Sequence, residues 1–200
     1  MYKFEDITVG ENYVIREARR KDCVQIREMI KDLARVLGVP GNYPEYDVKT
    51  LEINGFDTNP PAFKCLVVEY KNRKTNLNNG FDSQNENDCT LVGYAFFFYT
   101  FSSLSGKEMF LEDFYIMEEH QGKGLGTKLF DSVVEVALNT NCSNMAFLVY
   151  DGNPVNNFYK RRGAINQTKE DKLHYCLIEY EQLIKLQQKR VINGKTIVEK

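Results

Sequence analysis

Gln121-Gly-Lys-Gly-Leu-Gly-Thr127 is the segment that decides the fold. It follows a run of strand-forming residues, Met109 to Met117, and it opens an amphipathic helical pattern. Glycines lack Cβ atoms, so the backbone of such a turn can approach a ligand closely. The first N–H groups of a helix have no partner within it, and the helix dipole adds partial positive charge there. The turn therefore predicts a phosphate site, with a ligand-free glycine turn as the alternative.

Two common phosphate-binding motifs do not match this turn. A P-loop requires Gly-Lys followed directly by Ser or Thr, whereas Gly122-Lys123 is followed by Gly124. A dinucleotide fingerprint requires glycines spaced by two and then three residues, whereas both spacings here are two. The sequence therefore predicts neither of those nucleotide-binding folds.

Outward from the turn, periodicity predicts a mixed α/β sheet flanked by helices. We expect strands over 13–17, 63–70, 90–101, 109–117, 145–150 and 173–178. The second, third and fourth of these are expected to form an antiparallel meander. We expect helices over 23–37, 48–53, 125–137, 156–162 and 180–189. The first of these carries its apolar residues at helical spacing, at Ile26, Met29, Ile30, Leu33 and Leu37.

These elements predict one domain over 13–189 with three less regular segments. Residues 1–12 are expected to be a loose N-terminal arm. The Asn-rich stretch 71–89 has almost no apolar content and is expected to be a solvated loop. Residues 190–200 contain Asn193-Gly194 between β-branched pairs, which favours either a hairpin or a frayed tail.

Composition excludes several classes of function. The 200 residues carry a net charge of −2, which argues against nucleic-acid binding through excess positive charge. The five cysteines are scattered and odd in number, as in a reduced cytoplasmic protein. Two histidines are too few for the common zinc sites, and the longest apolar run of eight residues is too short to span a bilayer. We therefore predict no metal, nucleic-acid or membrane partner.

Three motifs follow one another along the chain. Phe110-Leu-Glu-Asp-Phe-Tyr-Ile-Met117 comes first, the glycine turn second, and Asn157-Phe-Tyr-Lys-Arg-Arg-Gly-Ala164 third. Together they resemble the GCN5-related N-acetyltransferase (GNAT) superfamily, whose signature Q/R-x-x-G-x-G/A corresponds to Gln121, Gly124 and Gly126. The resemblance covers about residues 13–186. It implies an α/β GNAT fold, a mixed and mostly antiparallel sheet with a splayed central parallel strand pair, flanked by helices.

The combination of Leu-Glu-Asp-Phe with Phe-Tyr-Lys-Arg-Arg-Gly-Ala resembles a narrower group. This group contains the diamine (spermidine/spermine) acetyltransferases and their thialysine-acetylating relatives. The resemblance implies an acetyl-CoA-dependent N-acetyltransferase acting on a small cationic amine, such as a polyamine, a diamine or thialysine. It further implies a cytoplasmic homodimer.

Acetylation of an amine requires the removal of one proton and the delivery of another. A primary amine has a pKa of about 10.4, so only about one molecule in a thousand is neutral at pH 7. By resemblance, Glu112 is the general base, acting through water, and Tyr159 is the general acid for the departing thiolate. Glu112 and Asp113 are the candidate substrate-binding carboxylates, although strand alternation predicts that Asp113 faces the opposite side unless a bulge intervenes. The structural alternatives are a hydrogen-bonded carboxylate at Glu112 and a packing ring at Tyr159.

The resemblance also implies a set of residues that bind acetyl-CoA. Main-chain groups of the central strand would bind the pantetheine arm, the glycine turn would bind the pyrophosphate, and a later turn would line the far side of the pantetheine. Arg162 would meet a coenzyme phosphate, although it could equally belong to a solvated helix face. The implied set is Phe114, Tyr115, Ile116, Gln121, Gly122, Lys123, Gly124, Leu125, Gly126, Thr127, Asn153, Pro154, Val155, Asn156 and Arg162.

One departure from the narrower group concerns the acceptor amine. The diamine acetyltransferases carry a Tyr-Glu pair at the end of the first helix, where this chain has Val36-Leu37. Tyr43, Glu45 and Asp47 are candidate replacements. Two other functions therefore stay open: acetylation of a protein lysine or amino terminus, and a non-catalytic acyl-CoA-binding module.

Overall fold

The computed structural model describes residues 2–41, 43–71, 89–172 and 174–192. The chain divides into two compact units, Met1–Leu148 and Val149–Lys200, and each is described by itself. The first unit contains the sheet and the glycine turn. In its described part, the second unit contains the short helices α4 (Asn156–Lys160) and α5 (Gln167–Glu170) and the longer helix α6 (Tyr180–Ile192).

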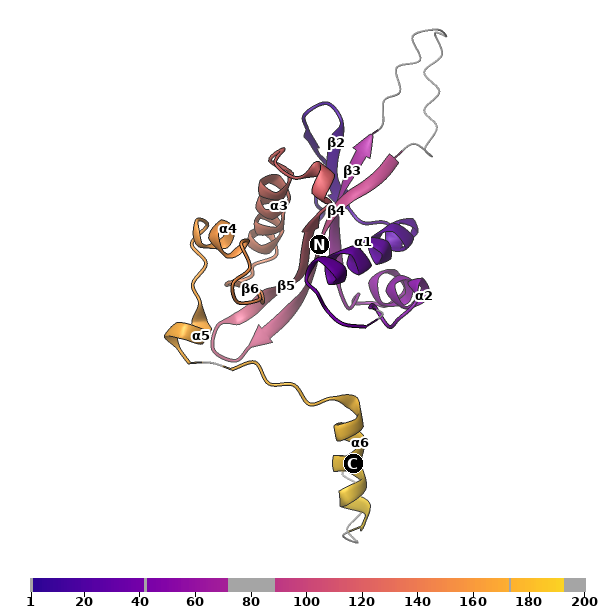
Figure 1. The fold of residues 1–200 in the computed structure, drawn as a ribbon, viewed down its shortest axis with the longest axis vertical. Helices are drawn as coiled ribbons and strands as arrows, with labels where there is room; N and C mark the ends of the chain where they lie inside the picture. Colours follow the sequence, from indigo (N-terminus) through magenta and orange to yellow (C-terminus); the bar gives the residue numbers. More distant parts are fainter. Residues whose placement is uncertain (1, 42, 72–88, 173, 193–200) are drawn as a thin grey trace. The chain divides into compact units, whose positions relative to one another are not determined.

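A six-stranded sheet in strict sequence order forms the centre of the first unit (Figure 1). Neighbouring strands are antiparallel except for the last pair, which is parallel. The sheet is thus mixed and mostly antiparallel, as predicted. Its strands are β1 (Ile7–Val9), β2 (Tyr13–Glu17), β3 (Lys64–Lys71), β4 (Cys89–Ser102), β5 (Gly106–Ile116) and β6 (Met145–Ala146).

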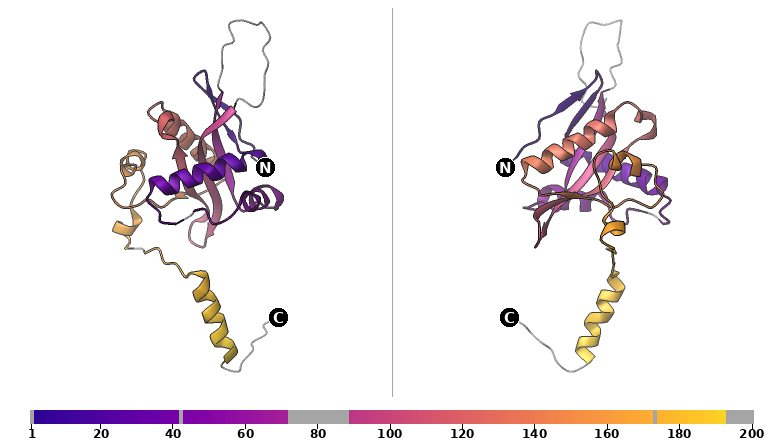
Figure 2. Two further views of the ribbon diagram at one scale, coloured as in Figure 1. Left: turned by 45° about the vertical axis from the view of Figure 1, so that its right-hand side comes forward. Right: turned by 90° about the vertical axis from the view of Figure 1, so that its left-hand side faces the viewer.

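Helices cover both faces of this sheet (Figure 2). The helix α1 (Cys23–Val36) lies on one face with α2 (Val48–Glu52), and α3 (Leu125–Asn139) lies on the other. The predicted stripe of α1 is confirmed, because Ile26 and Met29 are buried against Val67 and Tyr94 of the sheet. The apolar face of α3 is buried as well. Each such side chain contributes about 1.5–3 kcal/mol to folding.

The N-terminal arm is not loose. Residues Ile7–Val9 form β1 and pair with β2. Upstream, the Phe4 side chain is 3% exposed, and the Tyr2 hydroxyl donates to Oε1 of Glu135 on α3 at 2.9 Å. The segment was hard to predict because its anchors are isolated residues rather than a periodic pattern.

Two predicted strands are short or absent. The parallel strand expected over 145–150 reduces to β6, and Leu148 and Tyr150 are each 60% exposed. Residues 174–178 of the predicted strand 173–178 form no strand, and Tyr175 and Leu177 are largely exposed. A strand needs a neighbour for its backbone hydrogen bonds, and the described part of the second unit contains none.

Other predictions fall partly outside the described residues. Lys71 ends β3 and Cys89 begins β4, while the rest of the Asn-rich stretch, 72–88, lies outside the described residues. The predicted terminal helix is confirmed as α6, which includes Val191 and Ile192. The remainder of the predicted hairpin or tail, 193–200, is not described. No helix in the described part of the chain is long and apolar enough to cross a membrane.

Candidate active site

A β-bulge interrupts the pairing of β4 with β5. Phe96 pairs with Asp113 and Phe97 pairs with Leu111, so Glu112 is an extra residue in β5. A bulge places two residues opposite one and breaks the alternation of side chains along the strand. The exception allowed for Asp113 is therefore met, because a bulge is present and strict alternation does not hold at Glu112 and Asp113.

The two carboxyl groups at the bulge have different environments. The Tyr94 hydroxyl donates to Oδ2 of Asp113 at 3.2 Å. Burial and, to a smaller extent, the negative charge of Glu112 raise the pKa of Asp113 to about 6, against the lowering effect of the Tyr94 hydrogen bond. The Glu112 side chain is exposed. The bulge thus presents an accessible carboxylate beside a partly buried carboxyl group with a raised pKa.

Tyr46, on the segment between α1 and α2, is a site residue that sequence reasoning missed. Burial raises the pKa of Tyr46, and the charges of Asp113 and Glu112 raise it further. Its hydroxyl is therefore within electrostatic range of both carboxyl groups. Nε of Arg27, on α1, donates to the Tyr46 carbonyl at 2.8 Å and fixes this segment to the helix. No local pattern along the chain indicates Tyr46, because its relation to the β5 carboxyl groups arises only from the tertiary structure.

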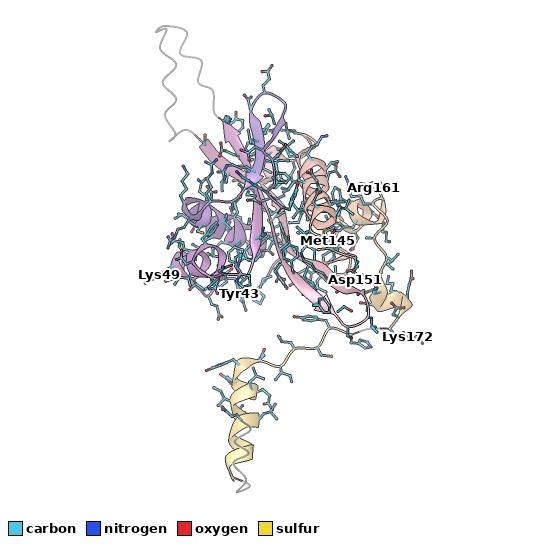
Figure 3. The ribbon with its side chains drawn as sticks, turned by 180° about the vertical axis from the view of Figure 1, so that it is seen from behind. Tyr43, Lys49, Met145, Asp151, Arg161 and Lys172 are labelled. Atoms are coloured by element: carbon cyan, nitrogen blue, oxygen red, sulfur yellow. The ribbon has the colours of Figure 1, made fainter. Side chains whose placement is uncertain are left out.

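The candidate replacements for the missing Tyr-Glu pair have other surroundings. Asp47 caps α2 by accepting from the Thr50 amide at 2.8 Å and from the Thr50 hydroxyl at 2.9 Å. Tyr43 and Glu45 are exposed. Figure 3 shows Tyr43 beside α2, on the same side of the sheet as Lys49. Tyr46 is the residue of this segment whose pKa the bulge carboxyl groups raise.

The edge of β5 that faces β6 is mostly unpaired. Within the described residues, the ladder joins only Met109 to Met145 and Phe110 to Ala146. The splayed parallel pair is thereby confirmed. Strand β6 ends at Ala146, so the parallel ladder does not continue past Phe110 of β5.

The register of β5 shows which backbone groups face that edge. The Met117 amide donates to the Val92 carbonyl of β4 at 2.9 Å. Because hydrogen-bonded and non-hydrogen-bonded pairs alternate in an antiparallel ladder, the Tyr115 backbone also faces β4, whereas Phe114 and Ile116 face the open edge. Nε2 of Gln121 indeed reaches the Ile116 carbonyl on that side, at 2.8 Å.

The glycine turn leads into α3 with the geometry of an anion site. Gly122 and Gly124 have left-handed φ values of 72° and 78°, and a Cβ at either would meet nothing within 4 Å. Gly124 is the N-cap of α3 and has no side chain to cap the helix. The start of α3 carries the partial positive charge of the helix dipole, and the space at the Cβ positions of both glycines is open, which fits a phosphate group.

In the second unit, Tyr159 lies in the short helix α4. The helix ends in a Schellman motif: the Gly163 amide donates to the Lys160 carbonyl at 3.0 Å and the Ala164 amide to the Tyr159 carbonyl at 3.1 Å. Gly163 has a φ of 87°, which suits glycine. The Tyr159 side chain is 7% exposed, and burial raises its pKa to about 12. The phenol therefore carries its proton throughout the neutral range.

The turn before α4 and the residues after it are held by local bonds. Oδ1 of Asn153 accepts from the Val155 amide at 3.0 Å, and Nδ2 of Asn156 donates to the Tyr150 carbonyl at 3.3 Å. The Arg162 guanidinium lies 3.6 Å from the centre of the Phe158 ring. This stacking orients Arg162 within its own unit, unlike the exposed Lys160 and Arg161.

The structure thus brings the predicted residues together in two groups. Glu112, Asp113, the end of β5 and the glycine turn belong to the first unit, while the 153–156 turn, Tyr159 and Arg162 belong to the second. Among the described residues, no group of three or more His, Cys, Asp or Glu side chains is arranged to hold a metal ion.

Comparison with known proteins identifies the family. Residues 39–164 match the model of the acetyltransferase (GNAT) family. The chain belongs to the GNAT acetyltransferase family. It is therefore an N-acetyltransferase of a family that uses acyl-CoA.

Curated relatives of this GNAT protein include amine acetyltransferases. Thialysine N-ε-acetyltransferase of Mus musculus is 35% identical over 78% of this chain and 86% of its own length. The Sus scrofa protein of the same name is 32% identical over 86% of this chain and 96% of its own length. Spermidine/spermine N(1)-acetyltransferase-like protein 1 of Homo sapiens is 32% identical over 88% of this chain, which spans only 24% of that longer protein.

Solved structures share the GNAT fold at low sequence identity. An integron cassette protein of Vibrio cholerae superimposes with a TM-score of 0.62 and 19% identity, over 90% of this chain and 99% of that one. An aminoglycoside acetyltransferase from an uncultured soil sample gives a TM-score of 0.61 and 14% identity, over 84% of this chain and 96% of that one. The predicted fold class is confirmed.

Proposed function

We propose that this GNAT protein transfers the acetyl group of acetyl-CoA to a primary amine of a small cationic substrate, a polyamine, a diamine or thialysine. The β-bulge is the observation that carries the proposal. It sets Glu112 and Asp113 side by side in β5, and the charges of both carboxyl groups raise the pKa of Tyr46. Two adjacent carboxyl groups with an aromatic neighbour suit an ammonium ion better than a neutral or acidic acceptor. The names of the thialysine-acetylating relatives support the same substrate class.

In the proposed mechanism Glu112 accepts the proton of the bound ammonium through a water molecule. The neutral nitrogen then forms a bond to the carbonyl carbon of the thioester, and the carbon–sulfur bond breaks. Tyr159 gives its phenolic proton to the departing sulfur, and the nitrogen, which still carries an excess proton after the new bond forms, releases that proton through water and so restores Tyr159. Asp113 holds the cation beside the strand.

Acetyl-CoA fits the residues of the first unit as follows. The open-edge groups of Phe114 and Ile116 would bind the pantetheine arm in place of a neighbouring strand. The glycine turn, from Gly122 to Thr127, would bind the pyrophosphate at the start of α3. Because the Tyr115 backbone faces β4, the register supports a smaller part for it than the resemblance implied. In the second unit, the 153–156 turn and Arg162 stay candidates for the pantetheine and a phosphate.

A panel of acceptors tests the substrate class. We expect turnover of spermidine, putrescine or thialysine to exceed turnover of a histone or ribosomal peptide by more than tenfold in kcat/KM. Faster acetylation of a peptide would favour a protein lysine or amino-terminal acetyltransferase instead. Binding of CoA by calorimetry without turnover of any acceptor would indicate a non-catalytic acyl-CoA-binding module.

The base is tested by Glu112→Gln. We expect kcat/KM for the amine to fall by roughly 10²-fold at pH 7 and to recover substantially near pH 9–10, where free amine is plentiful. Glu108→Gln is the matched control on the same strand, since Glu108 binds Ser105 and Asn144 at the far end of β5. A deficit that does not change with pH would count against the base.

The acid is tested by Tyr159→Phe. We expect kcat to fall by roughly 10²-fold or more while the affinity for CoA, measured by calorimetry, stays the same. Tyr175→Phe, at an exposed tyrosine of the same unit, is the control and should leave both unchanged. Normal turnover by the Tyr159 variant would remove it from the mechanism. A homodimer and a cytoplasmic location stay predictions from the resemblance.

A further inference from the structure

An aromatic cluster in the first unit lies beside the glycine turn. Tyr13 of β2 and Tyr70 of β3 are cross-strand partners, with ring centres 5.1 Å apart. The ring of His120, in the short 3-10 helix Glu118–His120, meets both, at 5.8 Å and 5.3 Å. These three residues are not part of the site described above, and the family motif does not include them.

The cluster is connected to the turn by polar contacts. Nδ1 of His120 lies 3.0 Å from the Tyr13 hydroxyl. Lys123 lies between the first two glycines of the turn. Its Nζ is 3.4 Å from the same hydroxyl and donates to the Glu119 carbonyl at 2.8 Å. The Lys123 ammonium is thus held at two points although its side chain is exposed.

The chemistry of these groups gives the contacts a direction. An ammonium group can only donate, so the Tyr13 oxygen accepts from Lys123. The Tyr13 proton is then free to go to Nδ1 of His120, which requires a neutral imidazole with its proton on Nε2. Burial lowers the pKa of His120, and the charge of Lys123 lowers it further, which keeps the ring neutral. The chain of bonds runs from Lys123 through Tyr13 to His120.

We propose that Tyr13 and His120 are positioning residues that hold the Lys123 ammonium for the phosphate groups of acyl-CoA at the glycine turn. A lysine side chain that is free to rotate loses rotamer entropy when it is fixed. Anchoring Lys123 before the ligand arrives removes part of that loss from binding. This inference rests on the proposed place of the phosphates, and its test separates the two.

Calorimetry with CoA measures the effect directly. We expect Tyr13→Phe to weaken CoA binding about 3–10-fold, the range for one lost hydrogen bond, with kcat at saturating acetyl-CoA and KM for the amine unchanged. KM for acetyl-pantetheine, a donor without phosphates, should not change. Tyr2→Phe is the control, because it removes another tyrosine hydrogen bond of the same unit, to Glu135, and should leave CoA binding unchanged.

Coupling to Lys123 decides the mechanism. We expect Lys123→Ala to weaken CoA binding about tenfold or more, and Tyr13→Phe to have no further effect in that background. His120→Leu should reproduce Tyr13→Phe, and His120→Gln, whose amide oxygen can accept the Tyr13 proton, should restore most of the affinity. If Tyr13→Phe folds poorly, the two His120 variants test the same Tyr13–His120 contact.

The contrary outcomes are distinct. If Lys123→Ala leaves CoA binding unchanged, the Lys123 ammonium does not contribute to phosphate binding and the positioning role is overturned, while the phosphate site at the turn is tested separately by Gly124→Ala. If Lys123→Ala weakens binding but Tyr13→Phe and His120→Leu do not, or if their effects add fully to that of Lys123→Ala, only the positioning role is overturned. An equal loss with acetyl-pantetheine would indicate general damage to the fold and would also overturn it.

Discussion

Asp113 combines burial, a hydrogen bond and a neighbouring charge in one carboxyl group. Its pKa of about 6 lies above the ordinary value of 3.8. The ionised form is therefore less favourable in the folded chain than in the unfolded one. Such a group destabilises the free protein at neutral pH and is relieved by a bound cation, which suits a substrate-binding role better than a structural one.

Replacement of Asp113 by Asn should stabilise the protein at neutral pH. The amide oxygen can still accept from Tyr94, but no charge is buried. Because the folded pKa of Asp113 is raised, its favourable contribution is complete below the unfolded pKa and is lost as the pH rises through about 6. At pH 7.5 we expect the free energy of unfolding of Asp113→Asn to exceed that of the wild type by up to about 3 kcal/mol.

Urea unfolding at pH 7.5 and pH 4 measures this difference. The advantage of the variant should have largely disappeared at pH 4. At that pH the wild-type carboxyl is protonated in the folded chain and close to half protonated in the unfolded chain. Equal stabilities at both pH values would show that the Asp113 carboxyl is not perturbed as described. A lower stability at pH 7.5 would show that the ionised carboxylate makes a favourable contact.

At the scale of elements, the site depends on three departures from regular structure. The bulge of β5 redirects Asp113, the early end of β6 shortens the parallel ladder along β5, and the left-handed Gly124 opens α3 without a side-chain cap. Each departure weakens the element that contains it and exposes backbone or carboxyl groups. The proposed acyl-CoA and amine contacts use those same groups.

Gly124→Ala tests the entry into α3. A left-handed φ of 78° costs a non-glycine residue about 1–2 kcal/mol, and the added methyl group would project into the open space proposed for phosphate. We expect a small loss of stability and a rise in KM for acetyl-CoA of about tenfold or more.

Gly106→Ala is the matched control for this change. Gly106 also has a left-handed φ, 84°, and open space around its Cβ position, but it lies in the turn between β4 and β5. The control should lose similar stability with no change in KM for acetyl-CoA. The same rise in KM for both variants would contradict the phosphate site at the turn.

At the scale of the molecule, the cysteines report on folding. All five are free thiols. Cys23, the first residue of α1, and Cys65 of β3 are both buried, and burial raises the pKa of both thiols, whereas Cys176 in the second unit is exposed. Since the thiolate is the reactive form, the two buried residues should react only when the first unit opens.

A thiol titration with Ellman's reagent checks this expectation. We expect Cys176 to react first in the native protein, Cys23 and Cys65 to react at least about a hundredfold more slowly, and all five to react in denaturant without reductant. Fast reaction of Cys23 or Cys65 would contradict the burial described for the first unit. Fewer than five thiols in denaturant would reveal a disulfide.

The sequence by itself determined the family, the central strands and the start of α3, because these depend on local patterns. Apolar residues at fixed spacing and glycines before a helix leave a direct trace in the chain. The motifs likewise supplied the proposed site residues, apart from Tyr46. A motif specifies residue types and their order along the chain.

Only the tertiary structure decided how those residues meet in the first unit. The bulge at Glu112 arises from the register of β5 against β4, and register is a relation between strands that neither strand encodes alone. Tyr46 reaches the carboxyl groups, and Tyr13 and His120 reach Lys123, across separations that no periodicity records. The failed strands at 147–150 and 174–178 have the same cause, since an apolar run becomes a strand only where a neighbour satisfies its backbone.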